Sequence, residues 1–145
     1  MQDKLKVSVV IPYYKGKKYI EQCILSVLNQ PYPNIELILI NDGSPDDGDT
    51  VCKALAEQDS RIRYFSKENE GIGATRNLGI RLATGDYIAF LDQDDIWCKN
   101  FLNENVVRKI ADGGDIVGFS HYVTDQSFKK GKRLTVSEKT MMGGG

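Results

Sequence analysis

The stretch IELILINDGS, residues 35–44, decides the fold class because it joins an apolar run to a polar turn. Similar apolar runs occupy residues 7–11 and 87–91, and two less continuous ones lie at residues 62–65 and 116–123. Strands that are apolar along nearly their whole length are typical of sheets covered on both faces. The five runs therefore predict the strands of a buried, mostly parallel sheet.

Segments with the apolar spacing of helices separate these runs, at residues 19–28, 49–58, 73–83 and 99–111. Residues 44–47, SPDD, have the pattern of a capping box with Pro45 as the first helical residue. Strands and helices that alternate through short connections predict an α/β fold of three layers, with helices on both faces of an open sheet. After residue 123 the pattern weakens, and only an edge strand near residues 133–136 is expected.

Composition indicates one soluble domain of 145 residues. Nineteen basic residues against 20 acidic ones leave a net charge of −1, so no nucleic-acid partner is expected. The three cysteines lack metal-ligand spacing, and no signal peptide or membrane span is evident, which predicts a reduced protein in the cytoplasm. We expect one domain over residues 1–140, a disordered tail over residues 141–145, and a chain truncated at its carboxyl end.

Polar residues gather where the predicted strands end. In open α/β sheets, ligands bind beyond the carboxyl ends of the strands. Four such strand ends carry polar residues, glycine or proline, at positions 12–14, 41–44, 69–71 and 92–95. The sequence therefore predicts one crevice at this edge of the sheet.

The segment LDQDD, residues 91–95, carries three carboxylates within four residues. These charges repel one another, and a hard divalent cation such as Mn²⁺ or Mg²⁺ relieves the repulsion. In an extended segment Asp92 and Asp94 point to the same side, so both can serve one metal complex. The alternative is a solvated acidic loop with Asp95 near the amino end of the next helix. The residues alone leave both interpretations open.

Asp42 and Arg76 are the other candidates for a ligand site. Asp42 ends the second apolar run, where its carboxylate either accepts a hydrogen bond from a nucleotide base or ribose, or belongs to an ordinary turn. Arg76 lies in GIGATRNLG, residues 71–79, which mimics a dinucleotide fingerprint but has arginine at the third glycine position. Arg76 therefore either faces the crevice as a cation or forms a surface ion pair with Glu70 or Asp92.

Together these segments resemble glycosyltransferase family 2, a large inverting family, over about residues 6–123. The opening strand and helix lie at residues 7–30, the second strand and acidic turn at residues 34–48, and the arginine and aspartate motifs at residues 69–95. The resemblance implies the GT-A fold, whose Rossmann-like, mostly parallel sheet is sandwiched between helices. It also implies transfer of a sugar from a nucleoside-diphosphate donor, with UDP-sugar expected, to a saccharide or lipid-linked acceptor with inversion.

By this resemblance the donor-binding residues can be assigned one by one. Pro12 and Tyr14 would line the base pocket, and Asp42 would hydrogen-bond the pyrimidine. Arg76 would help to hold the nucleotide, while Asp92 would approach the ribose or the sugar.

The resemblance also makes Asp94 the ligand of a Mn²⁺ or Mg²⁺ ion that bridges the diphosphate. Three positions depart from the family pattern: Lys15 replaces the usual asparagine, Asn41 the first aspartate of the acidic turn, and Thr75 an alanine. Lys15 and Asn41 leave open how the chain recognises the details of its donor, whereas the expected fold is unaffected.

An inverting transfer also needs a general base, and nothing after Asp95 resembles the family's later acidic segment, so no catalytic residue is assigned. The leading hypothesis is therefore an enzyme, or the donor half of one. The alternative is a catalytically incomplete module that binds nucleotide and metal. A nicotinamide-dependent oxidoreductase and a non-enzymatic signalling domain with an acidic pocket are the further alternatives. The protein is expected in the cytoplasm, or at the inner face of the membrane if the absent part of the protein binds there. The oligomeric state stays open.

Overall fold

The computed structural model describes residues 5–113, 120–124 and 130–135. The chain divides into two compact units, residues 1–103 and residues 104–145. The expected single domain over residues 1–140 stays a prediction, and the expected tail at residues 141–145 lies outside the described residues.

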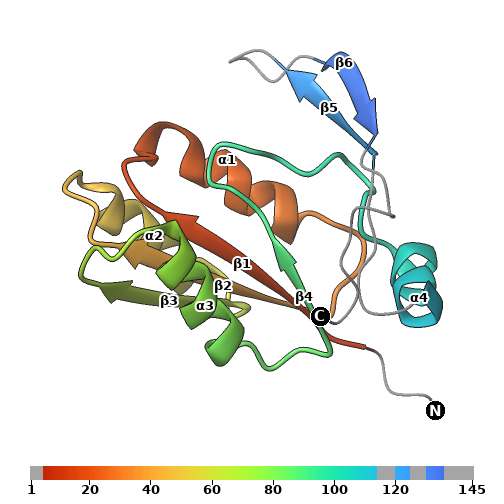
Figure 1. The fold of residues 1–145 in the computed structure, drawn as a ribbon, viewed down its shortest axis with the longest axis horizontal. Helices are drawn as coiled ribbons and strands as arrows, with labels where there is room; N and C mark the ends of the chain where they lie inside the picture. The colour runs from red at the N-terminus through yellow and green to blue at the C-terminus, as the bar shows by residue number, and fades with distance from the viewer. Residues whose placement is uncertain (1–4, 114–119, 125–129, 136–145) are drawn as a thin grey trace. The chain divides into compact units, whose positions relative to one another are not determined.

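A four-stranded parallel sheet forms the centre of the first unit (Figure 1). Its strands are β1 (Val7–Tyr13), β2 (Ile35–Asp42), β3 (Ile62–Lys67) and β4 (Tyr87–Phe90), in the spatial order β3-β2-β1-β4. All three pairings are parallel, so the carboxyl ends of the strands meet at one edge. The predicted parallel sheet is confirmed for these four strands.

Three helices, α1 (Lys17–Leu28), α2 (Gly48–Gln58) and α3 (Ile72–Leu82), cover the sheet. Gly48 of α2 lies against Tyr13 of β1, whereas Gly79 of α3 lies against Val10 of the same strand. Odd and even residues of a strand face opposite ways, so α2 and α3 cover opposite faces. Helix α1 packs against α2 and completes the three layers (Figure 1).

The core of this unit follows the apolar runs of the sequence. Strands β1 and β2 are buried at every position, as expected for strands covered on both faces. Strand β4 differs, because it lies at the edge of the sheet and leaves Ile88 and Phe90 about two-fifths exposed, at 39% and 45%. Cys23 and Cys52 are buried, while Cys98 is exposed.

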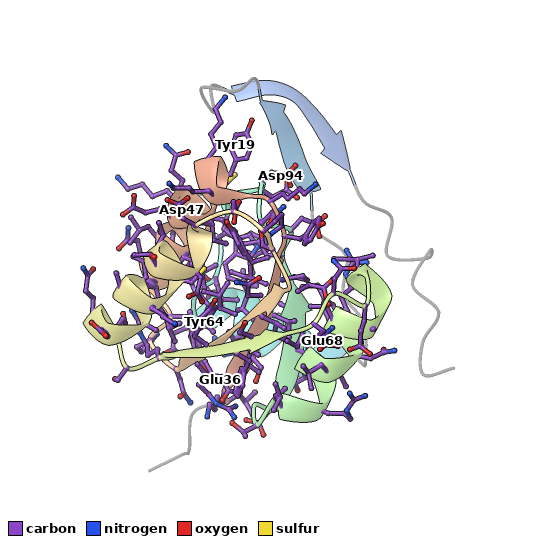
Figure 2. All side chains as sticks on the ribbon, turned by 90° about the vertical axis from the view of Figure 1, so that its left-hand side faces the viewer. Tyr19, Glu36, Asp47, Tyr64, Glu68 and Asp94 are labelled. Carbon is purple, nitrogen blue, oxygen red and sulfur yellow. The ribbon has the colours of Figure 1, made fainter. Side chains whose placement is uncertain are left out.

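The buried carboxylate of Glu36 links several segments at the end of the sheet where the strands begin. Glu36 accepts hydrogen bonds from Ser8 Oγ at 2.6 Å, from Arg63 Nη1 at 2.8 Å, and from the Thr84 N–H at 2.8 Å. Burial tends to raise its pKa, but these hydrogen bonds outweigh burial and lower the pKa from 4.5 to about 2. Figure 2 shows Glu36 and Asp94 far apart, toward opposite ends of the first unit, so this network is separate from the predicted crevice.

The second unit contains α4 (Glu104–Gly113) and an antiparallel pair of strands, β5 (Ser120–Thr124) and β6 (Lys130–Thr135). The prediction that the fourth helix starts at residue 99 is wrong, because residues 99–103 form a turn in which Asn100 has a φ of 59°. The fifth strand was expected in the parallel sheet, whereas β5 pairs antiparallel with β6. Residues 116–119 and 136, which belonged to the predicted strands, lie outside the described residues. Within the described ranges, no helix combines the length and apolarity that crossing a membrane requires.

Candidate functional site

The carboxyl ends of β1, β2 and β4 and the start of α3 surround a pocket of about 460 Å³. This volume lies in the range of small-molecule and cofactor sites. The six residues that the sequence singled out all line it, namely Pro12, Tyr14, Asp42, Arg76, Asp92 and Asp94. Tyr13, Asn69, Gly71 and Gln93, which belong to the strand ends expected at the crevice, also line the pocket, and Ile72, which the sequence did not single out, joins them.

Asp42 is buried at the pocket wall and holds the loop between β3 and α3. Its Oδ1 accepts hydrogen bonds from Lys67 Nζ and from the Glu70 N–H, both at 2.9 Å. Its Oδ2 accepts one from the Gly71 N–H at 3.0 Å. These bonds use most of the acceptor positions of the carboxylate, so Asp42 serves first as the anchor of a pocket loop.

The electrostatics of Asp42 follow from the same contacts. Burial tends to raise its pKa, but the hydrogen bonds from Lys67 and from the two N–H groups outweigh burial and lower the pKa. The pKa of Lys67 is raised in turn, through its hydrogen bonds to Glu70 and Asp42. Both groups are therefore charged at neutral pH and form a largely buried ion pair at the pocket wall.

Arg76 and Asp92 form an ion pair across the pocket, with Arg76 Nη2 3.0 Å from Asp92 Oδ1. One alternative for Arg76 was a pair with Glu70 or Asp92, and the Asp92 pair is present on the pocket wall itself. Among the described residues, the Arg76 Nε is buried without a hydrogen-bond acceptor. A buried donor without an acceptor is costly, so this nitrogen favours a ligand with an acceptor oxygen.

Asp92, Asp94 and Asp95 lie in a turn rather than in an extended segment, because the Asp95 N–H donates to the Asp92 carbonyl oxygen at 3.0 Å. The expectation that an extended backbone points Asp92 and Asp94 the same way is therefore wrong. Both side chains nevertheless line the pocket. Beneath the turn, the Cys23 thiol donates to the Asp92 carbonyl oxygen at 3.4 Å.

The segment between β2 and α2 departs from the predicted capping box. Helix α2 begins at Gly48, so Pro45 is not its first residue, and Asp47 makes no side-chain cap. The Ser44 and Tyr13 hydroxyls instead both donate to Asp46 Oδ1 at 2.7 Å. A side chain on Gly48 would overlap the Tyr13 hydroxyl, so the glycine lets the tyrosine reach Asp46.

Two of the three departures from the family pattern have structural roles. Asn41 is buried, donates to the Tyr64 hydroxyl at 3.0 Å and accepts from the Ser44 N–H at 2.9 Å. Thr75 is fully buried, and its hydroxyl donates to the Gly71 carbonyl oxygen at 2.8 Å. Neither lines the pocket. Lys15 is exposed with a φ of 54°, and its ammonium lies 5.4 Å from the centre of the Tyr14 ring.

Comparison with known proteins identifies the group to which this arrangement belongs. The sequence profile of Glycosyl transferase family 2 matches residues 8–143. The chain belongs to glycosyltransferase family 2. The resemblance inferred from the motifs is therefore confirmed.

Curated glycosyltransferases are similar to this chain over much of its length. It is 37% identical over 123 residues to the glycosyltransferase GlyA of Streptococcus pneumoniae, covering 84% of this chain and 18% of that protein. For GlyG of the same organism the identity is 39%, over 83% of this chain and 40% of that protein. The chain thus spans less than half the length of these relatives.

Solved structures agree on the fold. Staphylococcus aureus TarS 1–349 in complex with UDP superposes with a TM-score of 0.66 at 24% identity, over 74% of this chain and 32% of that one. The mannosyltransferase PcManGT of Pyrobaculum calidifontis, in complex with GDP-Man and Mn²⁺, gives a TM-score of 0.66 at 20% identity, over 84% of this chain and 36% of that one. The predicted GT-A-like α/β/α fold of this chain is therefore confirmed.

The pocket residues fit a divalent cation that a ligand helps to bind. The described residues contain no group of three acidic, histidine or cysteine side chains with metal-site geometry. Mg²⁺ and similar ions, however, are commonly held by one or two carboxylates together with substrate phosphates. Asp94 is exposed at the pocket and, within the described residues, accepts no hydrogen bond and forms no ion pair. Its oxygens are thus available to coordinate a cation that is also bound by a substrate phosphate.

Proposed function

We propose that this chain is the donor-binding part of an inverting, metal-dependent glycosyltransferase that uses a nucleoside-diphosphate sugar, with UDP as the nucleotide. The observation that carries the proposal is one pocket that gathers an exposed aromatic ring from the end of β1, an arginine of α3 and two aspartates that follow β4. Family membership supports sugar transfer in general. The nucleotide, the metal and the stereochemistry belong to the proposal.

Each side chain then has a chemical task. Tyr14 and Pro12 form the apolar wall for the base, and Asp42 fixes the loop beside it and offers a remaining lone pair to the base or ribose. The guanidinium of Arg76 supplies the buried Nε donor to a phosphate or ribose oxygen. Asp94, with Asp92 beside it, would hold Mn²⁺ or Mg²⁺, which would stabilise the negative charge on the departing nucleoside diphosphate.

A catalytically incomplete nucleotide-binding module is the second candidate, and one observation favours it. The carboxylates on the pocket wall are Asp42, Asp92 and Asp94. Most acceptor positions of Asp42 are used by Lys67 and the loop, Asp92 is paired with Arg76, and Asp94 is assigned to the metal. None of the three is left to take the proton of an acceptor hydroxyl, which an inverting transfer requires. On this proposal the base, the saccharide or lipid-linked acceptor and any contact with a membrane surface belong to residues beyond this pocket, in a protein of the cytoplasm.

Titration calorimetry with UDP, in the presence and absence of Mn²⁺, tests the proposal. The parent chain should bind UDP more tightly with Mn²⁺, and Asp94→Ala should remove the effect of the metal while the fold is retained. Asp95→Ala is the matched control, because it removes a carboxylate of the same turn that does not line the pocket. Equal Mn²⁺-dependent binding by the parent and Asp94→Ala would refute the metal assignment.

One further measurement separates the candidates, and another tests the assignment of Asp42. Release of sugar from a UDP-sugar to an acceptor by this chain would exclude the incomplete module. Asp42→Ala should weaken UDP binding by about 1–3 kcal/mol, since it removes both a pocket acceptor and the anchor of the loop. Unchanged affinity in that variant would remove Asp42 from the site.

A further inference from the structure

Gln93, the middle residue of the aspartate motif, makes a two-bond contact with the backbone of Tyr14. The Tyr14 N–H donates to Gln93 Oε1 at 2.7 Å, and Gln93 Nε2 donates to the Tyr14 carbonyl oxygen at 2.6 Å. We propose that this contact, the Gln93 clamp, is a positioning device that couples the base side of the pocket to its metal side. The inference rests on the proposed function and assigns Gln93 a role within the same site.

The clamp lies just beyond the last paired residues of β1 and β4. Strands β1 and β4 pair as far as Val10 and Phe90, and the Leu91 N–H still donates to the Val10 carbonyl oxygen. Beyond this point β1 continues to Tyr13, while the chain after β4 enters the aspartate turn. The side-chain amide of Gln93 presents one acceptor and one donor, as a backbone peptide group does. It thereby joins the two diverging segments in place of the missing strand pairing.

Gly16 leaves the space that the clamp occupies. A Cβ atom built on Gly16 would lie 2.3 Å from both Cδ and Oε1 of Gln93. The backbone of Gly16 has a φ of −111° and a ψ of 26°, a conformation open to residues with side chains. The requirement for glycine therefore comes from the Gln93 amide and not from the backbone.

The position of the clamp gives it a consequence for binding. Tyr14 and Gln93 both line the pocket. In the proposed function Tyr14 contacts the base, whereas Gln93 stands between Asp92 and Asp94, which face the metal. A segment that orders around a cation at Asp94 therefore also fixes the backbone of Tyr14. Coupling between two sites is reciprocal, so the clamp should let Mn²⁺ strengthen UDP binding and let UDP strengthen Mn²⁺ binding by the same factor.

A double-mutant cycle on the full chain tests the clamp from both sides. Gln93→Ala removes the amide, whereas Gly16→Ala displaces it by adding one methyl group against the flexible end of the side chain. The measured quantity is the Mn²⁺ enhancement, the ratio of the UDP dissociation constants without and with Mn²⁺. Each single variant should lower it by roughly fivefold, which is the effect of one net hydrogen bond. The double variant should lower it no further, because both changes abolish the same contact.

Controls and a second readout make the test decisive. Gln22→Ala, at an exposed position of α1, should behave as the parent. Hydrogen exchange of the Tyr14 amide should accelerate in both single variants, which a general loss of stability would not confine to that residue. An unchanged enhancement in Gln93→Ala, or additive effects in the double variant, would overturn the clamp while leaving the proposed function intact. Absence of UDP binding by the parent chain would overturn both.

Discussion

Replacing Glu36 by glutamine should destabilise the protein in a way that depends on pH. Glutamine keeps the shape of the side chain but removes its charge, and it turns an NH₂ group toward donors that now point at a carboxylate oxygen. Those donors come from Ser8, Arg63 and Thr84. Because the pKa of Glu36 falls from 4.5 to about 2 on folding, its ionised form contributes about 3 kcal/mol to the free energy of unfolding at neutral pH.

The sign of the pH dependence follows from the direction of this change. A carboxyl group whose pKa is lowered by folding stabilises the protein above its unfolded value of 4.5, and the stabilisation is lost as the pH falls toward 2. The free-energy difference between the parent and Glu36→Gln should therefore shrink by about 2 kcal/mol between about pH 7 and about pH 3. Stability lost through other acidic groups is shared by both proteins and cancels in the difference.

Urea unfolding followed by circular dichroism at the two pH values measures this difference. Glu57→Gln, at an exposed position of α2, is the matched control and should differ from the parent by less than about 0.5 kcal/mol at either pH. A Glu36→Gln penalty of equal size at both pH values would refute the argument. It would mean that the hydrogen bonds do not favour the ionised carboxylate.

Three other predictions concern the packing of the first unit. Lys67→Met should lower the free energy of unfolding by about 3 kcal/mol or more in urea titrations, because it leaves the buried charge of Asp42 unpaired; full stability would mean that Asp42 is neutral. Tyr64→Phe should cost about 1 kcal/mol, with UDP affinity unchanged within about twofold, because the hydroxyl accepts from Asn41 and donates to Asp49, neither of which lines the pocket; a marked loss of affinity would contradict this. Gly79→Ala should lower stability by about 1–3 kcal/mol in thermal unfolding, since the new Cβ would lie 2.3 Å from a methyl group of Val10; an unchanged melting temperature would place α3 farther from β1.

The sheet and the location of the pocket were predictable from local sequence. A run such as residues 35–40 is long enough, and apolar enough, to specify a strand buried on both faces. Once parallel strands are established, their carboxyl ends must meet at one edge, which is why Asp42 and Asp94 line the same pocket. The positions of the strands and the lengths of their connections are therefore enough to locate the pocket from the sequence.

The segments that were not predicted are held by contacts distant in sequence. Residues 99–103 have helical apolar spacing, yet the buried side chain of Gln30 donates to the Cys98 carbonyl oxygen and accepts from the Leu102 N–H. These bonds span about seventy residues and satisfy the backbone outside a helix, so periodicity alone misplaces the start of α4. The hydrogen bonds from Lys67 and the β3–α3 loop to Asp42 were not predicted, for the same reason.

The three thiols give this protein internal reporters of motion. Burial raises the pKa of Cys52 to about 12, and burial together with nearby aspartates raises that of Cys23, whereas Cys98 is exposed. An alkylating reagent should therefore modify Cys98 first, and Cys23 only when the aspartate turn above it lifts. The rate at which Cys23 is alkylated would then measure how often the aspartate turn opens in the native protein, without an attached probe.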